Sequence, residues 1–238
     1  MRFDHRPPTA DAHVFDRVWT TRSDSADTMT SVARTSVHLI IARSRGVVTA
    51  GLRGPETKAS TAPVPAETEF LGVRFTSGAR FRSHPVSSMV DGYVPLVVTD
   101  GGRIVIGGEE REAPTFENVE DFVRKLVGAG TLLPAPRDDD HLRLQDVTTR
   151  TRERRYRALA GMPRTAAMQI ERANTAALML SQGHHWLGVV TELGYSDQPH
   201  LAHALRRFVG RTASEIRSDG VSGLSFLYKT DAEQRVSV

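Results

Sequence analysis

Residues 186–217 carry the pattern that most restricts how this chain can fold. Apolar residues recur at helical spacing in two short stretches, and Gly194 separates the stretches where a sharp turn needs a left-handed backbone. Asp197 stands before the second stretch as a helix N-cap, and Pro199 falls in its first turn, where proline is tolerated. The spacing predicts a helix-turn-helix, whose second helix presents an exposed face to a partner.

The side chains of the two predicted helices divide into an inner and an outer set. We expect the inner set to form the core: Trp186, Leu187, Val190, Leu193, Tyr195, Leu201, Leu205 and Phe208. The outer set consists of Gln198, Pro199, His200, Ala202, His203 and Arg206. Glutamine pairs with adenine through two hydrogen bonds, and arginine or histidine donates to guanine. Arg206 and Arg207 suit phosphate, so the motif predicts binding to double-stranded DNA.

Charge is distributed unevenly along the chain. Residues 1–140 hold 17 Lys and Arg against 19 Asp and Glu, whereas residues 141–217 hold 12 Arg against 6 acids. Arginine binds phosphate or guanine through two parallel hydrogen bonds more readily than lysine does. A basic module after a nearly neutral one indicates that the former meets a polyanion, although a solvated basic face would give the same charge count.

Composition excludes several classes of protein. The chain has no cysteine, which excludes disulfides, Cys-ligated zinc and thiol chemistry. It has no apolar run long enough to span a membrane, and residues 1–13 lack the apolar segment of a secretory signal. We therefore expect a cytoplasmic protein that does not bind a membrane.

Residues 1 to about 112 are expected to be mostly β. Short apolar or alternating runs predict strands at Val14–Thr20, Ser36–Ala42, Val47–Leu52, Glu69–Thr76, Tyr93–Thr99 and Arg103–Ile106. Asp100-Gly101-Gly102 predicts a hairpin turn between the last two runs. Lys58–Ala66 is expected to be a loop, because two prolines interrupt a Ser, Thr and Ala sequence.

The rest of the chain is expected to be helical, in separate parts. A helix is predicted at Asn118–Ala129, capped by Asn118, and a longer one at Arg164–Ser181, ended by Gly183. The fold class expected is α+β, with a mostly-β N-terminal domain and an all-α C-terminal domain. The predicted domains are an N-terminal sensing or dimerisation domain at 1–131, a linker at 132–141, a helical DNA-binding domain at 142–217 and a tail at 218–238. Leu224, Phe226, Leu227 and Tyr228 could dock the tail.

The second half resembles the AraC/XylS family of transcription regulators. The residues that carry the resemblance are Gly194-Tyr195, His200-Leu201, Arg206-Arg207-Phe208, Gly210 and the closing run Thr212–Arg217. The family has two helix-turn-helix units joined by a long helix, and this implies that Arg164–Ser181 is that helix. Its 18 residues span roughly 27 Å at 1.5 Å per residue, which suits two successive major grooves about 34 Å apart.

The resemblance implies a first recognition helix upstream of residue 164. Arg154-Arg155-Tyr156 and Gly161 hold family positions, so Arg150, Thr151, Glu153 and Arg154 would face DNA, with Tyr156 and Leu159 inward. Three departures are present. Arg152 replaces an apolar residue, Glu153 would repel phosphate unless it reads cytosine N4, and Arg137–Leu144 is short and acidic where a supporting helix belongs. GLRGPET, FLGVRFTSGARF and PTFENVEDFVRKLVGAG resemble an N-terminal domain of actinobacterial AraC-type regulators, which has no generally established ligand.

Histidines outside the motif do not predict a metal site. His184-His185 lacks partners at ligand spacing and is expected to be exposed, and His5, His13, His38 and His84 match no metal-binding spacing. Gly51–Gly54 lacks the Gly-Lys-Ser/Thr ending of a phosphate loop, and Glu109, Glu110 and Glu112 are expected to form a solvated rim. We expect no cofactor.

The sequence thus predicts a DNA-binding transcription regulator, specifically an activator, that alters recruitment of RNA polymerase. A small-molecule effector would shift the population of a DNA-competent arrangement, and the N-terminal domain would bind it, form a homodimer, or both. The alternative is a protein-interaction module with weak or lost DNA binding, whose β domain binds a partner such as RNA polymerase; Asp138–Asp140 and Glu153 favour it. No nucleophile–base pair or paired carboxylates predict an enzyme.

Overall fold

The structure is a computed structural model that describes residues 3–7, 14–136 and 148–219. The described chain is α+β, which confirms the expected fold class at that level. The strands are β1 Phe3–Arg6, β2 Phe15–Ser23, β3 Asp27–Ser31, β4 His38–Ser44, β5 Val47–Arg53, β6 Ser60–Val64, β7 Thr68–Phe75, β8 Arg80–Phe81, β9 Tyr93–Val98, β10 Arg103–Ile106, β11 Glu109–Glu112 and β12 Leu132–Leu133. The helices are α1 Val86–Met89, α2 Val119–Gly128, α4 Thr149–Ala160, α5 Arg164–Ser181, α6 Trp186–Leu193, α7 Gln198–Ala204, η1 Leu205–Val209 and α8 Ala213–Asp219.

The chain divides into two compact units, each assembled from separate segments. The sheet unit comprises Met1–Ala26, Ser36–Pro55 and Pro65–Arg164, and the helical unit comprises Asp27–Thr35, Glu56–Val64 and Thr165–Val238. The chain therefore passes from one unit to the other five times. These limits differ from the predicted boundaries at residues 131 and 142, because α4 belongs with the sheet unit and a pair of N-terminal strands belongs with the helices.

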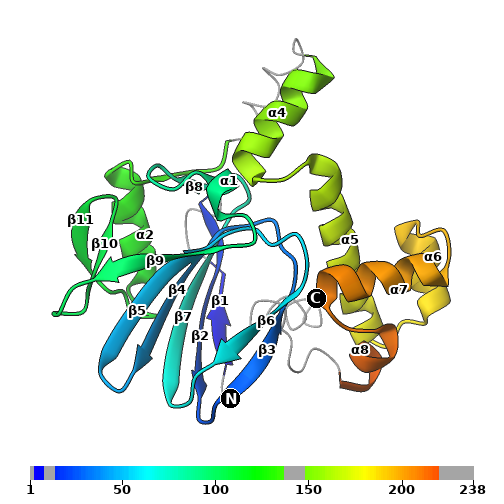
Figure 1. Ribbon diagram of the computed structural model, residues 1–238, viewed down its shortest axis with the longest axis horizontal. Coiled ribbons are helices and arrows are strands. Elements are labelled where there is room, and N and C mark those ends of the chain that lie inside the picture. The colour runs from blue at the N-terminus through cyan, green and yellow to red at the C-terminus, as the bar shows by residue number, and fades with distance from the viewer. Residues whose placement is uncertain (1–2, 8–13, 137–147, 220–238) are drawn as a thin grey trace. The chain divides into compact units, whose positions relative to one another are not determined.

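An antiparallel sheet of eight strands dominates the sheet unit, in the order β1-β2-β7-β4-β5-β9-β10-β11 (Figure 1). The six predicted strands all exist, with ends displaced by three residues or fewer. The predicted hairpin joins β9 to β10, with Val97 opposite Val105. Its turn closes through the N–H of Gly102, which donates to the Thr99 carbonyl at 2.8 Å, and Gly102 has the positive φ of 72° that favours glycine.

One face of this sheet packs on α2 to form the core of the unit. Apolar residues alternate along the strands, so Leu39, Leu52 and Val73 are fully buried on the same face. Helix α2 buries Phe122, Val123 and Leu126, which recur at helical spacing on one face. The predicted cap by Asn118 is wrong in detail, because its side chain makes no cap hydrogen bond and accepts instead from the Thr115 N–H at 2.8 Å.

The opposite face of the sheet needs glycine at two places where aromatic rings lie against the backbone. A Cβ on Gly72 would lie 2.0 Å from the Trp19 indole, and a Cβ on Gly51 would lie 2.2 Å from the Tyr93 ring. Trp19 faces Gly72 across β2 and β7, so the register of these strands sets the contact. Glycine here makes room for a side chain from the neighbouring strand, which is a packing role.

Two predictions about irregular segments are wrong. The expected loop at Lys58–Ala66 contains strand β6, which pairs with β3 as an isolated antiparallel ribbon. Pro63 is tolerated there because each strand of a two-stranded ribbon has an unpaired edge. The start of the expected linker is strand β12, which pairs with β8, and Leu132 is fully buried. The remainder of that linker from residue 137, and the predicted tail dock at residues 224–228, lie outside the described residues.

The β3–β6 ribbon is held to the helices of its own unit by hydrogen bonds. The N–H groups of Ala33 and Ala59 donate to the carbonyls of Phe208 and Arg207, at 2.7 and 2.8 Å. Asn174 on α5 donates from its side chain to the Ala33 carbonyl at 3.0 Å. The bonds to Phe208 and Arg207 satisfy carbonyls that a helix end otherwise leaves without an intrahelical partner, so the ribbon completes the end of η1.

A buried ion pair fixes the base of the ribbon. The Nε of Arg34 lies 2.9 Å from Oε2 of Glu56, and both side chains are at most a tenth exposed. The Ser31 hydroxyl donates to the same carboxylate at 2.8 Å, and the Ser60 hydroxyl donates to its other oxygen at 3.1 Å. Because the charges are paired and hydrogen-bonded, their burial is tolerated, and the two strands are locked in one register.

Helix α5 has the bounds predicted from the sequence. It runs from Arg164 to Ser181, and Gly183 follows with a φ of 90°. Its buried side is made of Ile170, Ala173, Ala177 and Leu180, which recur at helical spacing.

Candidate nucleic-acid interface

The turn between α6 and α7 follows from two residues. Gly194 ends α6 in the left-handed conformation with a φ of 66°, as its position in the sequence predicts. Tyr195 is 5% exposed, and its N–H donates to the Val190 carbonyl at 3.0 Å. A left-handed glycine followed by a buried aromatic residue reverses the chain within a few residues, so α7 starts at a fixed angle to α6.

Helix α7 begins at the predicted cap. The Asp197 carboxylate accepts from the His200 N–H at 2.7 Å, and Pro199 lies in the first turn. Leu201, Leu205 and Phe208 are buried as predicted. The inner face of α6 is only partly as predicted: Val190 is buried and Trp186 and Leu193 are half-buried. Leu187 is 55% exposed, and Val189 is buried instead.

The predicted outer face of α7 and η1 is available to a partner. The exposed members are Gln198, Pro199, His200, His203, Arg206 and Arg207, and Ala202 is half-buried. These residues offer hydrogen-bond donors on short and long side chains, with two cations at the C-terminal end. The arrangement suits a polyanion whose bases are read at one end and whose phosphates are held at the other.

The C-terminal end of this helix is a π-helical turn, which the sequence did not predict. Leu205–Val209 forms η1, and Gly210 ends it with a φ of 77°. A Cβ on Gly210 would lie 2.8 Å from Thr30 and 3.0 Å from Ala59, both on the ribbon. The ribbon therefore packs directly behind the turn that carries Arg206 and Arg207, and it restricts where their backbone can move.

Arg172 on α5 contacts the turn and was not among the predicted site residues. Its guanidinium carbon lies 4.5 Å from the centroid of the Tyr195 ring, and its NH1 group is 3.5 Å from the Gly194 carbonyl oxygen. Burial raises the pKa of the Tyr195 phenol above its usual value, and the Arg172 charge opposes that rise. A cation over a desolvated aromatic ring is an attractive contact, so α5 holds the turn in place.

Helix α4 carries the second set of predicted DNA-binding residues, within the sheet unit. Arg150 and Arg154 are exposed, as are Arg152, Arg155 and Arg157, whereas Thr151 is half-buried. Tyr156 and Leu159 are half-buried, where the prediction was that they face inward. Gly161 ends the helix with a φ of 75°, and a Cβ there would lie 2.7 Å from Val90. An arginine-rich face of this kind is suited to phosphate contacts.

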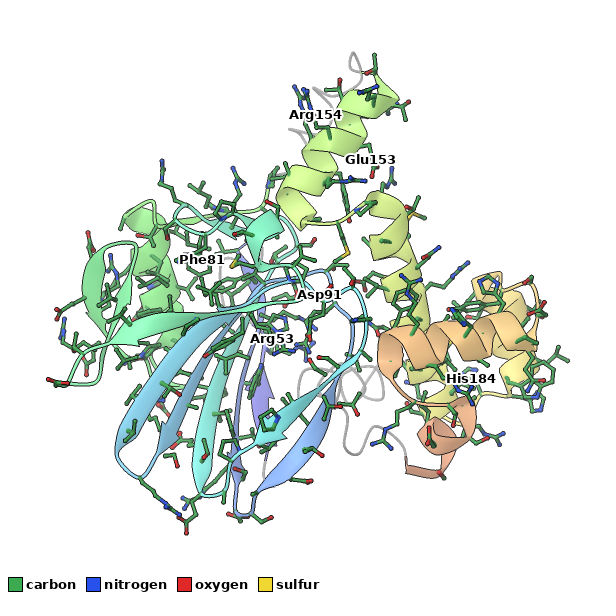
Figure 2. All side chains as sticks on the ribbon, in the orientation of Figure 1. Arg53, Phe81, Asp91, Glu153, Arg154 and His184 are labelled. Carbon is green, nitrogen blue, oxygen red and sulfur yellow. The ribbon has the colours of Figure 1, made fainter. Side chains whose placement is uncertain are left out.

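Glu153 differs from its neighbours on α4. Its carboxylate accepts from the N–H of Arg164, the first residue of α5, at 3.2 Å, and the residue is half-buried. Figure 2 shows Glu153 and Arg154 leaving α4 on different sides. A carboxylate at a helix N-terminus is stabilised by the helix dipole, so this contact gives Glu153 a role within the fold. The supporting helix expected near Arg137–Leu144 falls outside the described residues.

The histidines weighed as metal ligands lie in separate surroundings. His38 is fully buried and its Nε2 is 3.0 Å from the Ser36 hydroxyl, and the Nδ1 of His84 is 2.9 Å from the Ser83 hydroxyl. His184 and His185 are exposed, as expected. In the described part of the chain, no three His, Cys, Asp or Glu side chains gather as a metal site, and no helix is long and apolar enough to cross a membrane.

Comparison with known proteins finds no match to a family model, a curated protein or a solved structure. The candidate interface therefore rests on its own geometry and on the sequence pattern.

Proposed function

We propose that the protein is a sequence-specific DNA-binding transcription regulator of the AraC/XylS type. One observation carries the proposal: α7 and η1 expose Gln198, His200, His203 and Arg206 on one side while the opposite side is buried. Helices α6 and α7 would form a helix-turn-helix, with α7 as the recognition helix in the major groove. The N-capped start and the glycine turn support this reading because both fix the direction of α7.

Within this proposal α4 belongs to a first helix-turn-helix unit and supplies phosphate contacts. Its exposed arginines support that role, whereas Glu153 is engaged with the start of α5. Base reading would then depend mainly on α7, and α4 would add affinity that is independent of sequence. The sheet unit would bind an effector, form a homodimer, or both, and the bound regulator would alter recruitment of RNA polymerase.

The proposal is tested by selection of genomic DNA fragments with the full chain at about 50 and about 200 mM salt. We expect a few promoter fragments to be retained at both concentrations. Gln198→Ala and His203→Ala should reduce the ratio of specific to non-specific binding, each by about tenfold for one lost base contact of 1–3 kcal/mol. Arg22→Ala, an exposed arginine on β2, is the matched control and should leave the ratio unchanged. Retention without selectivity by the unaltered protein would contradict the proposal.

A second function is favoured by one specific contact. Because Glu153 is bonded within the fold and α4 belongs to the sheet unit, α4 could present its arginines to an acidic protein surface instead of DNA. In that case Arg154→Ala would weaken binding to RNA polymerase and leave DNA retention unchanged. The DNA-binding proposal expects the opposite result: a shallower dependence of affinity on salt, by about one released counterion for the lost phosphate contact.

A further inference from the structure

We infer that His200 reads a guanine through its Nε2–H group, because Ser196 holds the imidazole in the tautomer that presents this proton outward. The inference rests on the proposed function and names the base that one residue of the interface recognises. It is carried by the contacts of the His200 ring with two residues, Ser196 and Tyr195, and Arg172 lies over the Tyr195 ring in turn.

The first contact determines which ring nitrogen of His200 carries the proton. The backbone N–H of Ser196 points to Nδ1 at 3.4 Å, and the Ser196 hydroxyl lies 3.1 Å from the same atom. A backbone N–H can only donate, so Nδ1 must accept. In a neutral imidazole the proton then resides on Nε2, so this nitrogen of the exposed residue is a donor.

The second contact fixes the orientation of the ring. The His200 ring meets the Tyr195 ring edge-to-face, with centroids 5.1 Å apart and an angle of 83° between the planes. Tyr195 is buried, and Arg172 lies over its ring. The imidazole of this exposed residue thus packs against the buried Tyr195 ring, which reduces the rotamer freedom that His200 loses on binding.

The donor that results selects among bases in the major groove. Guanine presents two adjacent acceptors there, N7 and O6, whereas cytosine presents a donor that would oppose the Nε2–H group. Adenine offers N7 beside its own amino donor, and thymine offers O4 beside a methyl group. A donor held in one direction is therefore best satisfied by guanine.

His203 provides a matched comparison on the same helix. It is exposed one turn after His200, but among the described residues no hydrogen bond to its ring is found. The proton of a neutral His203 ring can therefore lie on either nitrogen, so the ring can bond to either a donor or an acceptor of the base. The two histidines should therefore differ in how strictly they select.

The test uses the full chain and an operator selected as above, in which each guanine in turn is replaced by 7-deazaguanine. We expect one position where the replacement weakens binding of the unaltered protein about five- to tenfold, the effect of one lost hydrogen bond. The same replacement should not weaken binding of His200→Ala further, and it should still weaken binding of His203→Ala. Equal losses for the unaltered protein and His200→Ala at every position would overturn the inference.

Nitrogen NMR of the imidazole gives an independent readout in the protein without DNA. We expect the His200 Nδ1 resonance at the position of an unprotonated nitrogen, and protonation at Nδ1 in the neutral ring would overturn the inference.

Variants of Tyr195 test the second contact. Tyr195→Phe keeps an aromatic ring and should preserve the selectivity for guanine, whereas Tyr195→Leu should lose this selectivity. Adding Tyr195→Leu to His200→Ala should cause no further loss of selectivity. If the unaltered protein selects no operator, both the proposed function and this inference fail. If the unaltered protein selects an operator that His200→Ala binds with the same selectivity, only this inference fails.

Discussion

The two units of the molecule reach a compact state by different routes. In the sheet unit, consecutive strands pair as hairpins at β4–β5, β9–β10 and β10–β11, so much of the structure comes from neighbours in sequence. The helical unit combines a contiguous set of helices with a ribbon whose strands come from two earlier parts of the chain. The difference indicates that the helices, although they contain the whole predicted recognition motif, are an incomplete folding unit by themselves.

The most severe way to test this difference is to remove the ribbon. We expect the contiguous fragment 165–219 to show no cooperative thermal transition, because the buried partners of η1 and α5 would be missing. The measurement is circular dichroism on heating, with the full chain for reference. A fragment containing residues 27–35 and 56–64, joined to the helices by glycine-rich linkers, should regain the transition; a cooperative transition in 165–219 alone would contradict the comparison.

A smaller change leaves the ribbon in place and breaks its ion pair. We expect Glu56→Ala to destabilise the protein by about 3–5 kcal/mol, because it leaves the Arg34 guanidinium buried without its carboxylate. Denaturation in urea measures the effect. The control is Arg124→Ala on α2, which removes an exposed ion pair with Asp121 and should cost less than about 1 kcal/mol. Similar losses of unfolding free energy for both variants would show that the buried ion pair of the ribbon stabilises the protein no more than an exposed pair does.

A still smaller effect is expected where the ribbon meets the end of η1. Gly210→Ala adds a Cβ at a positive φ and places it against Thr30 and Ala59, so we expect a loss of about 1–3 kcal/mol. The thermal midpoint of the full chain measures the change. A neutral result would mean that the ribbon yields easily and does not support η1.

The smallest expected effect has the opposite sign. It comes from a glycine of the same unit at which an added side chain would meet no other atom. Gly188 lies inside α6, and a Cβ added there meets no atom within 4 Å. Alanine lowers the entropy of the unfolded chain and favours the helix, so Gly188→Ala should stabilise the protein by about 0.5–1 kcal/mol. Together the two glycine substitutions separate an effect of ribbon packing from a general sensitivity to larger side chains.

Prediction from sequence succeeded where local pattern decides structure. The bounds of α5, the turn at Gly194 and the cap at Asp197 follow from spacing and residue type, and the structure has them. The ribbon was missed because Ser60–Val64 has no apolar alternation and contains a proline, and its strand exists through pairing with β3. The strand Glu109–Glu112 was likewise missed because it exists through pairing with β10, although its three glutamates are exposed, as the prediction of a solvated rim requires.

The candidate site divides in the same way. Exposure of the outer residues of α7 follows from helical periodicity, so the sequence could place them on one face. The roles of Arg172 and Ser196 depend on which atoms meet after the turn has formed, and neither residue type signals those contacts beforehand. Leu187 was expected inside and lies outside, because in a helix of eight residues a one-position error in the assigned face changes which side chains are buried.

The five passages of the chain between the units have a consequence for how such a protein can be inherited and rebuilt. A module that occupies one uninterrupted stretch of a gene can be moved by a single recombination event or fused to a different domain by joining two pieces of DNA. The helical unit is encoded in three separate stretches, so transferring it intact requires several simultaneous exchanges. Selection would therefore alter this protein by substitution within its existing frame, and chimeras built at residue 142 or 165 would carry the proposed recognition helix without the strands that complete its unit.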